Sequence, residues 1–127
     1  MTAVFLYGAL TLAAPRAAVL GRATDPAAAT LPGHDLQWTG DDALPWLVPA
    51  GGAAVAGLLL EATAEDLDRL ARFAGGAAPR PVTLAGGRGA LAYAQPVAGR
   101  GAGPAQPWRA GDWAPRWAAT VAGAAAD

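Results

Sequence analysis

The sequence of 127 residues contains no cysteine, no lysine and no serine. Without cysteine the chain has neither a disulfide framework nor a cysteine-based zinc or redox site, and without serine it has no serine nucleophile. The single histidine, His34, has no second histidine, cysteine or suitably spaced acid with which to form a zinc site or a catalytic triad. We therefore expect no metal and no other cofactor, and we interpret His34 as a surface or loop residue.

Charge is also scarce. Nine arginines stand against ten acidic residues, which gives a formal net charge of −1. A nearly neutral domain does not attract the nucleic-acid backbone or an anionic membrane, so neither is an expected partner. Apolar stretches stay well short of the ~20 residues that a membrane-spanning helix needs, and no charged leader precedes one. These features predict a cytoplasmic protein.

The length fits a single domain with a core of its own. Residues 3–7 are apolar throughout and rich in β-forming side chains, which is typical of a strand covered on both faces. Strand and helix signals alternate with turns along the rest of the chain, and this mixture predicts an α+β fold. The other expected elements are a short helix ending at Gly21, extended pieces at 29–31, 35–38 and 45–49, a turn at Gly51-Gly52, a strand at 53–61 and a hairpin of 82–84 with 90–94.

The clearest helix is expected after Thr63. Thr63 is a favourable N-cap residue, and Asp66 stands three positions later, where the acid of a capping box lies. Apolar residues then recur at helical spacing until Gly75-Gly76 ends the helix. In the strand before it, Gly57 indicates a bulge or a place where another group approaches the backbone closely.

The C-terminal part has a different composition. Residues 96–107 are mostly glycine, alanine and proline, which is typical of an irregular connector. Asp112 is expected to cap a last helix that carries Trp113 and Trp117. We interpret these rings and Trp108 as core residues, because each buries a large area, with a protein partner bound through them as the minority interpretation. The predicted organisation is a core at 1–95 and a connector with a tryptophan-bearing helix at 96–127, packed on the same domain.

Two features bear on chemistry. The segment Tyr7-Gly8-Ala9-Leu10 follows directly on the first strand, and its glycine would let a ligand approach unpaired backbone N–H groups that form a small anion-binding nest. A plain strand-ending turn explains the same residues equally well. Glu61, at the end of a predicted strand, is the one glutamate without an obvious structural task.

Several segments occur in a characteristic order. A strand ending in Tyr-Gly-x-Leu precedes a Leu-Pro-Gly bend, a Pro-x-Leu-Val-Pro piece, a glycine-containing strand, a helix running into Phe-Ala-Gly-Gly and a hairpin ending in Ala-Tyr-Ala. These segments are residues 4–10, 31–36, 45–49, 55–60, 65–76 and 92–94. Their order resembles the γ-glutamylcyclotransferase-like (AIG2-like) family over residues 3–95. Within the family, the chain looks most like the cyclotransferase-like domain fused ahead of Nudix hydrolases in some bacteria.

The resemblance implies a single-domain mixed β-barrel with short flanking helices and a cavity at one mouth. In active relatives the α-amine of a γ-glutamyl amine or peptide attacks its own γ-carbonyl, so that 5-oxoproline forms and the remainder leaves. The resemblance places the glutamyl end, or a similar carboxylate group, at Tyr7, Gly8, Ala9, Leu10 and Tyr93. A glutamate just after the helix takes a proton from the ammonium, because only the free amine can attack.

This chain departs from the family at that glutamate. The family's Tyr/Phe-Glu-Gly context is here Phe73-Ala74-Gly75, so Ala74 stands where the base is expected. The loss of a positioned base costs about 10²–10⁴ in rate. Our leading hypothesis is therefore a pseudoenzyme, that is, a small-molecule-binding or regulatory module with weak or no activity.

Two alternatives stay open. In the first, the chain is an active cyclotransferase that uses another acid, for which Glu61 is a weak candidate. Asp68 is a poor candidate, because a separation of six residues puts it well around the helix from Ala74. In the second, the domain is a scaffold or regulator for a separately encoded hydrolase, which it contacts through Trp108, Trp113 and Trp117.

Overall fold

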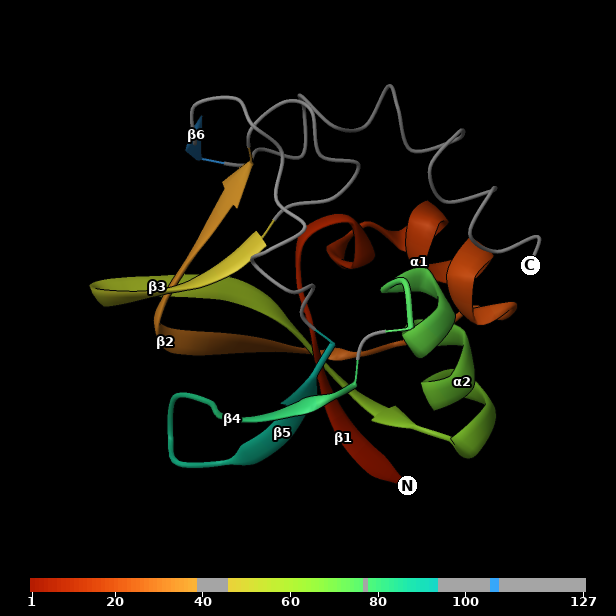
Figure 1. Cartoon of the computed structure of the whole chain (residues 1–127). Helices are drawn as coiled ribbons and strands as arrows, with labels where there is room; N and C mark the ends of the chain where they lie inside the picture. Colours follow the sequence, from red (N-terminus) through yellow and green to blue (C-terminus); the bar gives the residue numbers. More distant parts are fainter. Residues whose placement is uncertain (39–45, 77, 94–105, 108–127) are drawn as a thin grey trace.

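The computed structural model describes residues 1–38, 46–76, 78–93 and 106–107 (Figure 1). Its strands are β1 (Thr2–Leu6), β2 (Ala27–Trp38), β3 (Trp46–Ala62), β4 (Arg80–Thr83), β5 (Gly89–Ala92) and β6 (Gln106–Pro107). Its helices are the 3₁₀ turn η1 (Gly8–Thr11) and the α-helices α1 (Ala13–Leu20) and α2 (Ala64–Phe73). The α+β prediction is confirmed, and the described elements form one domain.

The strands form one mixed sheet in the order β4-β5-β1-β3-β2-β6. β1 pairs with β5 in parallel and with β3 antiparallel, so that Leu6 lies opposite Leu58 and Ala3 opposite Glu61. The helices α1 and α2 contact each other and lie together on one side of the molecule, away from the β4–β5 hairpin loop (Figure 1). β1 therefore leads from the middle of the sheet straight into the η1 turn beside the helices.

The sheet curls but is not closed by strand pairing among the described residues. In the strand order, β4 and β6 stand at the two edges. One backbone hydrogen bond joins the β4–β5 hairpin loop to β2, from the Ala85 N–H to the Thr30 carbonyl at 2.9 Å. The barrel that the resemblance implied is thus a curled open sheet here, because a loop residue rather than a strand ladder bridges the gap.

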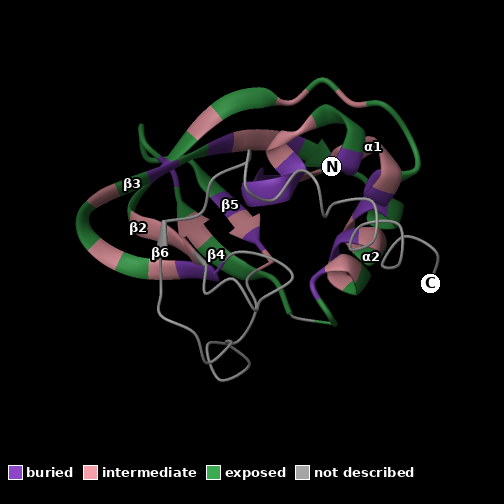
Figure 2. Ribbon diagram, turned by 90° about the horizontal axis from the view of Figure 1, so that it is seen from above, coloured by how far each residue is buried: buried purple, intermediate pink, exposed green. Residues whose placement is uncertain are grey.

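Side chains of β1 alternate between two cores. Val4 and Leu6 pack with α1, α2 and η1 on one face, whereas Phe5 packs with Leu31 and Leu84 inside the curl of the sheet. Figure 2 shows the buried residues along the middle of the sheet and on the inner sides of the helices. Both faces of β1 are covered, as its continuous apolar sequence predicts.

The stretch from Trp46 to Ala62 is one long strand, whereas the sequence predicted two extended pieces with a turn at Gly51-Gly52. In the β2–β3 ladder, Pro32 pairs with Ala54 and His34 pairs with Pro49. Residues 50–53 therefore lie opposite Gly33 alone and form an irregular bulge of four residues against one. Positive φ angles at Gly33 and Gly52, 74° and 81°, let both chains bend there without parting.

Of the two explanations that the sequence offered for Gly57, the structure shows the close approach, which is made by Phe5 and Leu6 of β1. A Cβ atom at this position would stand 2.6 Å from Cζ of Phe5 and closer still to the carbonyl oxygen of Leu6. Any side chain on residue 57 would therefore push β1 away from β3 at the point where β1 ends and η1 begins.

The capping box of α2 forms as predicted. The Thr63 hydroxyl accepts from the Asp66 N–H at 3.1 Å, and the Asp66 carboxylate accepts from the Thr63 N–H at 2.9 Å. Asp66 is buried and also pairs with Arg22, which follows α1, at 2.5 Å. Burial raises the pKa of Asp66, but the hydrogen bonds from Arg22 and Thr63 outweigh it, so the pKa lies below its usual value. A charged carboxylate thus ties the two helices together.

The remaining predictions for the C-terminal part fall largely outside the described residues. The helix capped by Asp112 and the positions of Trp108, Trp113 and Trp117 lie there. Within the expected connector, Gln106–Pro107 pairs with β2 residues Gln37 and Trp38, so a strand occurs where an irregular chain was predicted.

Candidate functional site

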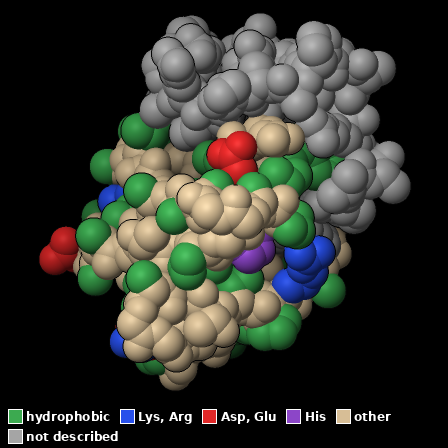
Figure 3. Space-filling model, turned by 90° about the vertical axis from the view of Figure 1, so that its left-hand side faces the viewer, with side chains coloured by type: hydrophobic (Ala, Val, Ile, Leu, Met, Phe, Trp, Pro, Cys, Tyr) green, Lys and Arg blue, Asp and Glu red, His purple; other side chains and the backbone are tan. Residues whose placement is uncertain are grey.

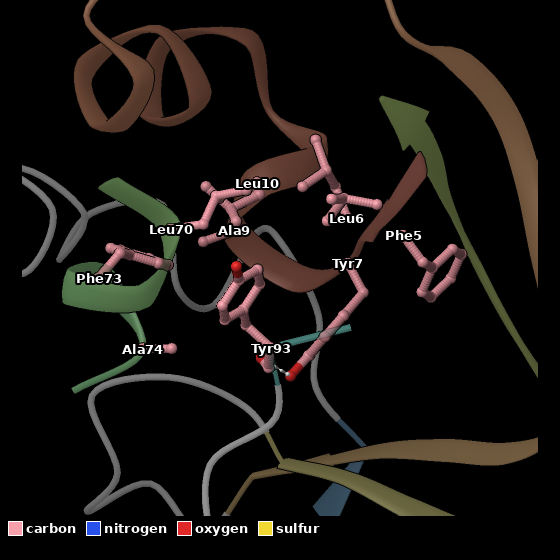
Figure 4. Close-up of a pocket in the computed structure, with 10 residues that line it drawn as sticks. Phe5, Leu6, Tyr7, Ala9, Leu10, Leu70, Phe73, Ala74 and Tyr93 are labelled. Atoms are coloured by element: carbon pink, nitrogen blue, oxygen red, sulfur yellow. Dashed lines mark hydrogen bonds between the residues drawn. The ribbon is translucent and has the colours of Figure 1, made fainter. Parts of the chain in front are cut away.

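A pocket opens between the end of β1, the η1 turn and the C-terminal half of α2 (Figure 4). It contains about 490 Å³ of empty space, part of which is open to solvent. Among the described lining residues, the tyrosine hydroxyls are the polar side-chain groups and the other side chains are hydrocarbon. The described lining consists of Val4, Phe5, Leu6, Tyr7, Ala9, Leu10, Leu70, Phe73, Ala74 and Tyr93.

Tyr7 and Tyr93 meet at the pocket. The Tyr7 hydroxyl donates a hydrogen bond of 2.9 Å to the Tyr93 carbonyl oxygen, and the Tyr7 ring stacks near Phe5 with ring centroids 6.2 Å apart (Figure 4). Burial raises the pKa of Tyr7 to about 12, although the positive charge of Arg80 acts in the opposite direction. At neutral pH this hydroxyl is therefore a protonated donor and does not serve as a base.

The side chain of Tyr93 also faces the pocket, with its ring between Tyr7 and the end of α2 (Figure 4). Burial raises the pKa of Tyr93, and the negative charge of Asp68 on α2 raises it further. Its hydroxyl is a protonated hydrogen-bond donor at neutral pH as well.

The η1 turn brings backbone groups to the same place. Gly8 has a φ angle of 61°, which favours glycine, and the first hydrogen bond of the turn runs from the Leu10 N–H to the Tyr7 carbonyl at 3.4 Å. The N–H groups of Gly8 and Ala9 precede that bond and have no acceptor within the turn. Gly8, Ala9 and Leu10 are buried; Ala9 and Leu10 line the pocket, whereas Gly8, which the sequence also placed there, is not among its described lining residues.

Arg16 holds the far end of the turn. From α1, its Nη1 donates to the carbonyl oxygens of Leu10 and Thr11 at 3.2 and 3.3 Å, and its Nε donates to the Thr24 hydroxyl at 3.0 Å. The Thr11 hydroxyl closes the turn from within, by donating to the Gly8 carbonyl at 2.7 Å. The Arg16 guanidinium and the Thr11 hydroxyl thus support carbonyl groups at the two ends of the turn.

Ala74 stands on the opposite wall. It is the C-cap residue of α2, its N–H donates to the Leu70 carbonyl at 3.0 Å, and its side chain is buried. Figure 4 shows its methyl group beside Phe73 and facing Tyr93. The structure therefore brings Ala74 together with Tyr7, Ala9 and Leu10, as well as Tyr93.

Glu61 lies elsewhere. It pairs with Ala3 in the β1–β3 ladder, three positions from the Leu6–Leu58 pair beside the pocket, a separation of about 10 Å along the strand. Its half-exposed carboxylate forms an ion pair of 2.5 Å with Arg88 on the β4–β5 hairpin. The structure does not bring Glu61 to the described lining.

Two kinds of feature do not occur in the described part of the chain. Within the described ranges, no three side chains of histidine, aspartate or glutamate gather closely enough to hold a metal ion. Over the same ranges, none of the helices is both long and apolar enough to span a bilayer.

The comparisons with known proteins agree with this geometry. The model of the family described as gamma-glutamyl cyclotransferase, AIG2-like, matches residues 4–114, which include both walls of the pocket. The chain belongs to this family. No curated protein matches the chain.

Solved structures resemble the chain at low sequence identity. The solution structure of At5g39720.1 from Arabidopsis thaliana has a TM-score of 0.65 and 20% identity, over 90% of this chain and 80% of that one. The solution structure of At3g28950.1 from the same plant has a TM-score of 0.66 and 18% identity, over 89% and 72%. The crystal structure of uncharacterized protein PH0828 from Pyrococcus horikoshii has a TM-score of 0.62 and 18% identity, over 89% and 90%. At these identities the likeness shows the shared fold.

Sequence reasoning missed several residues of this AIG2-like pocket. Leu70 is one of the apolar residues at helical spacing, and nothing in the sequence separates a pocket wall from a core contact. Arg16 carried a usable signal, because it is the one charged residue in the otherwise apolar helix Ala13–Leu20. A lone guanidinium on such a helix indicates a partner nearby, which here is the end of η1.

Proposed function

We propose that this AIG2-like chain binds a γ-glutamyl compound, or a small molecule with a similar carboxylate group, in the pocket beside η1, and that it cyclises such a ligand weakly or not at all. The turn amides of Gly8 and Ala9 supply hydrogen-bond donors for the carboxylate end. The hydrocarbon wall from Leu10, Leu70 and Phe73 suits the methylene chain of a glutamyl group. Membership of the family supports the choice of ligand.

The observation that carries the proposal is the chemistry of the described lining. Cyclisation requires that the ligand's ammonium group loses a proton before its nitrogen attacks the γ-carbonyl. The described lining residues include no aspartate, glutamate or histidine, and both tyrosine hydroxyls keep their protons at neutral pH. A methyl group at Ala74 can neither accept that proton nor balance the charge of a bound ammonium.

The alternative is an active cyclotransferase that uses another acid. Glu61 would serve poorly, since it is engaged with Arg88 away from the pocket. The charge of Asp68 acts on the Tyr93 hydroxyl, but Asp68 is exposed and is not among the described lining residues, so it too would serve poorly. The two readings differ in whether the unaltered chain releases 5-oxoproline.

The test is to restore a carboxylate. We expect the unaltered protein to release 5-oxoproline from γ-glutamyl amines and dipeptides at a rate near background. Ala74→Glu should raise the rate by about 10²–10⁴, because the new carboxylate extends from the α2 C-cap toward Tyr93. Chromatographic measurement of 5-oxoproline against time gives both rates.

Two controls sharpen the result. Ala74→Gln adds the same bulk without a base, so it should stay inactive. Turnover at ordinary enzymatic rates in the unaltered protein, abolished by Asp68→Asn or by Glu61→Gln, would establish the active alternative and overturn the proposal.

A scaffold role for a partner hydrolase and a cytoplasmic location stay predictions. The tryptophans that would contact the hydrolase lie outside the described residues. Co-purification of a hydrolase that is lost in Trp117→Ala would support the scaffold role, whereas an unchanged complex would speak against this surface.

A further inference from the structure

The arginines of the described part differ in whether they have partners. Arg16, Arg22, Arg69 and Arg88 donate to named protein groups, and Arg72 also interacts with another group. Arg80 is exposed, and within the described residues it forms neither a hydrogen bond nor an ion pair. A cation without a partner beside a pocket is available to an anionic ligand.

Strand register places Arg80 beside the tyrosine pair. Arg80 is the first residue of β4 and pairs with Ala92 of β5. Ala92 directly precedes Tyr93, whose carbonyl accepts the Tyr7 hydroxyl. The charge of Arg80 also reaches that hydroxyl, since it acts on the pKa of Tyr7 against the larger effect of burial.

Arg80 also lines a second hollow, whose described lining comes mostly from β4, β5 and the start of β1 and shares no described residue with the pocket. Its lining includes Arg80, Thr83 and Gly89 from the hairpin, together with Thr2 and His34. Figure 3 shows histidine atoms in purple with arginine atoms in blue beside them on this face. The rest of this lining is largely apolar, so a ligand that extends outward past Tyr7 would meet the Arg80 guanidinium as the cationic group among its described residues.

We propose that Arg80 binds a carboxylate at the outer end of the ligand, so that the preferred ligand is a γ-glutamyl amino acid or peptide rather than a γ-glutamyl amine with a neutral remainder. This rests on the proposed function, since it requires the glutamyl end to occupy the pocket beside η1. The planar guanidinium binds a carboxylate by donating two parallel N–H···O hydrogen bonds, which no other free group of the described pocket rim can do.

Two ligands that differ only in this charge provide the test. γ-Glutamyl-alanine carries the outer carboxylate, and γ-glutamyl-alaninamide replaces it with a neutral amide of the same shape. By isothermal titration calorimetry we expect the acid to bind the unaltered protein about three- to tenfold more tightly than the amide, as befits a partly exposed charged hydrogen bond. Arg80→Gln should bind both equally, and Arg80→Lys should keep part of the preference.

Arg88→Gln is the matched control. Arg88 is also an exposed arginine of the β4–β5 hairpin, but it is engaged with Glu61, so its loss should leave the preference unchanged. Equal binding of the two ligands to the unaltered protein, or an unchanged preference in Arg80→Gln, overturns the role of Arg80 and leaves the proposed function standing. If neither ligand binds the unaltered protein, the proposed function fails and this inference fails with it.

Discussion

Tyr7 has two tasks at the level of single residues. Its backbone begins the η1 turn, and its hydroxyl ties that turn to Tyr93 at the end of β5. Because burial favours the neutral phenol, the hydrogen bond is made by the form present at physiological pH. Because of the same burial, the contribution of Tyr7 to stability decreases at alkaline pH.

The sign of that dependence is definite. In the unfolded chain Tyr7 loses its proton near its ordinary pKa of 10, whereas in the folded protein it keeps the proton until the pH reaches about 12. Its contribution is fully present below pH 10 and is lost as the pH rises toward 12. Tyr7→Phe should therefore lower the free energy of unfolding at pH 8 by about 1 kcal/mol and show a shallower decline between pH 10 and 12. Urea unfolding at several pH values measures both.

Tyr93→Phe serves as the comparison, since it removes a phenol but keeps the Tyr7 hydrogen bond to a backbone carbonyl. It should retain the decline that belongs to Tyr7. Equal slopes in Tyr7→Phe and the unaltered protein would contradict the assignment of the raised pKa.

Local sequence rules predicted the residues whose role depends on near neighbours. Thr63 with Asp66, and Gly21 at the end of α1, lie within one helical turn of the groups that they serve. Arg80 and Tyr93 could not be related in this way, because their proximity comes from the β4–β5 pairing and from β5 lying beside β1. The place of Ala74 at the site was predicted only by the family resemblance.

At the scale of elements, the junction between η1 and α1 depends on Arg16, a side chain of α1. Arg16 satisfies carbonyl groups at the end of a short 3₁₀ turn, where the backbone alone leaves them without partners. Hydrogen-bond geometry in a 3₁₀ turn is poorer than in an α-helix, so side-chain support of its carbonyl groups adds to its stability.

Arg16→Gln should loosen this junction selectively. We expect amide hydrogen exchange at Leu10 and Leu12, whose N–H groups bond to Tyr7 and Ala9, to become about tenfold faster, which corresponds to about 1.4 kcal/mol of local stability. Exchange in β1 should change little. Two-dimensional NMR in heavy water resolves the individual amides.

The control is Arg69→Gln, which breaks an exposed i,i+4 pair with Glu65 on α2 and leaves η1 untouched. It should not alter exchange at Leu10 or Leu12. Unchanged exchange at these amides in Arg16→Gln would show that the turn holds its shape without the guanidinium.

Element boundaries were predictable where a single residue ends a helix and less so within the sheet. The Gly51-Gly52 pair has the composition of a turn, yet the chain continues along β2 through a bulge. Whether two glycines reverse a chain or bend a strand depends on the partner strand, which local sequence does not specify. The pairing of Gln106–Pro107 with β2 was hidden for the same reason.

At the scale of the whole molecule, β1 is the strand on which the other parts depend. It pairs on both edges, carries side chains into both cores and ends at the pocket. Mixed secondary structure in one domain followed from the sequence pattern, but the openness of the sheet did not, because closure depends on contacts such as that between Ala85 and Thr30.

This arrangement predicts an order of opening. The amides of β1 that bond within the ladders should exchange most slowly, with protection close to the global free energy of unfolding, and those of the edge strand β4 should exchange faster. Hydrogen exchange across a series of low urea concentrations measures both the order and its dependence on denaturant. Amides of β4 that outlast those of Val4 and Leu6 would refute it.

The close contact between the end of β1 and Gly57 of the neighbouring strand β3 has a consequence for how this site can change in evolution. Phe5 and the Leu6 carbonyl occupy the room that a methyl group would need. Since Tyr7 is the next residue, widening that contact would carry one wall of the pocket outward with it. We therefore expect ligand preference to change through substitutions at the pocket rim and at the end of α2. Gly57 in turn keeps the width of the pocket constant.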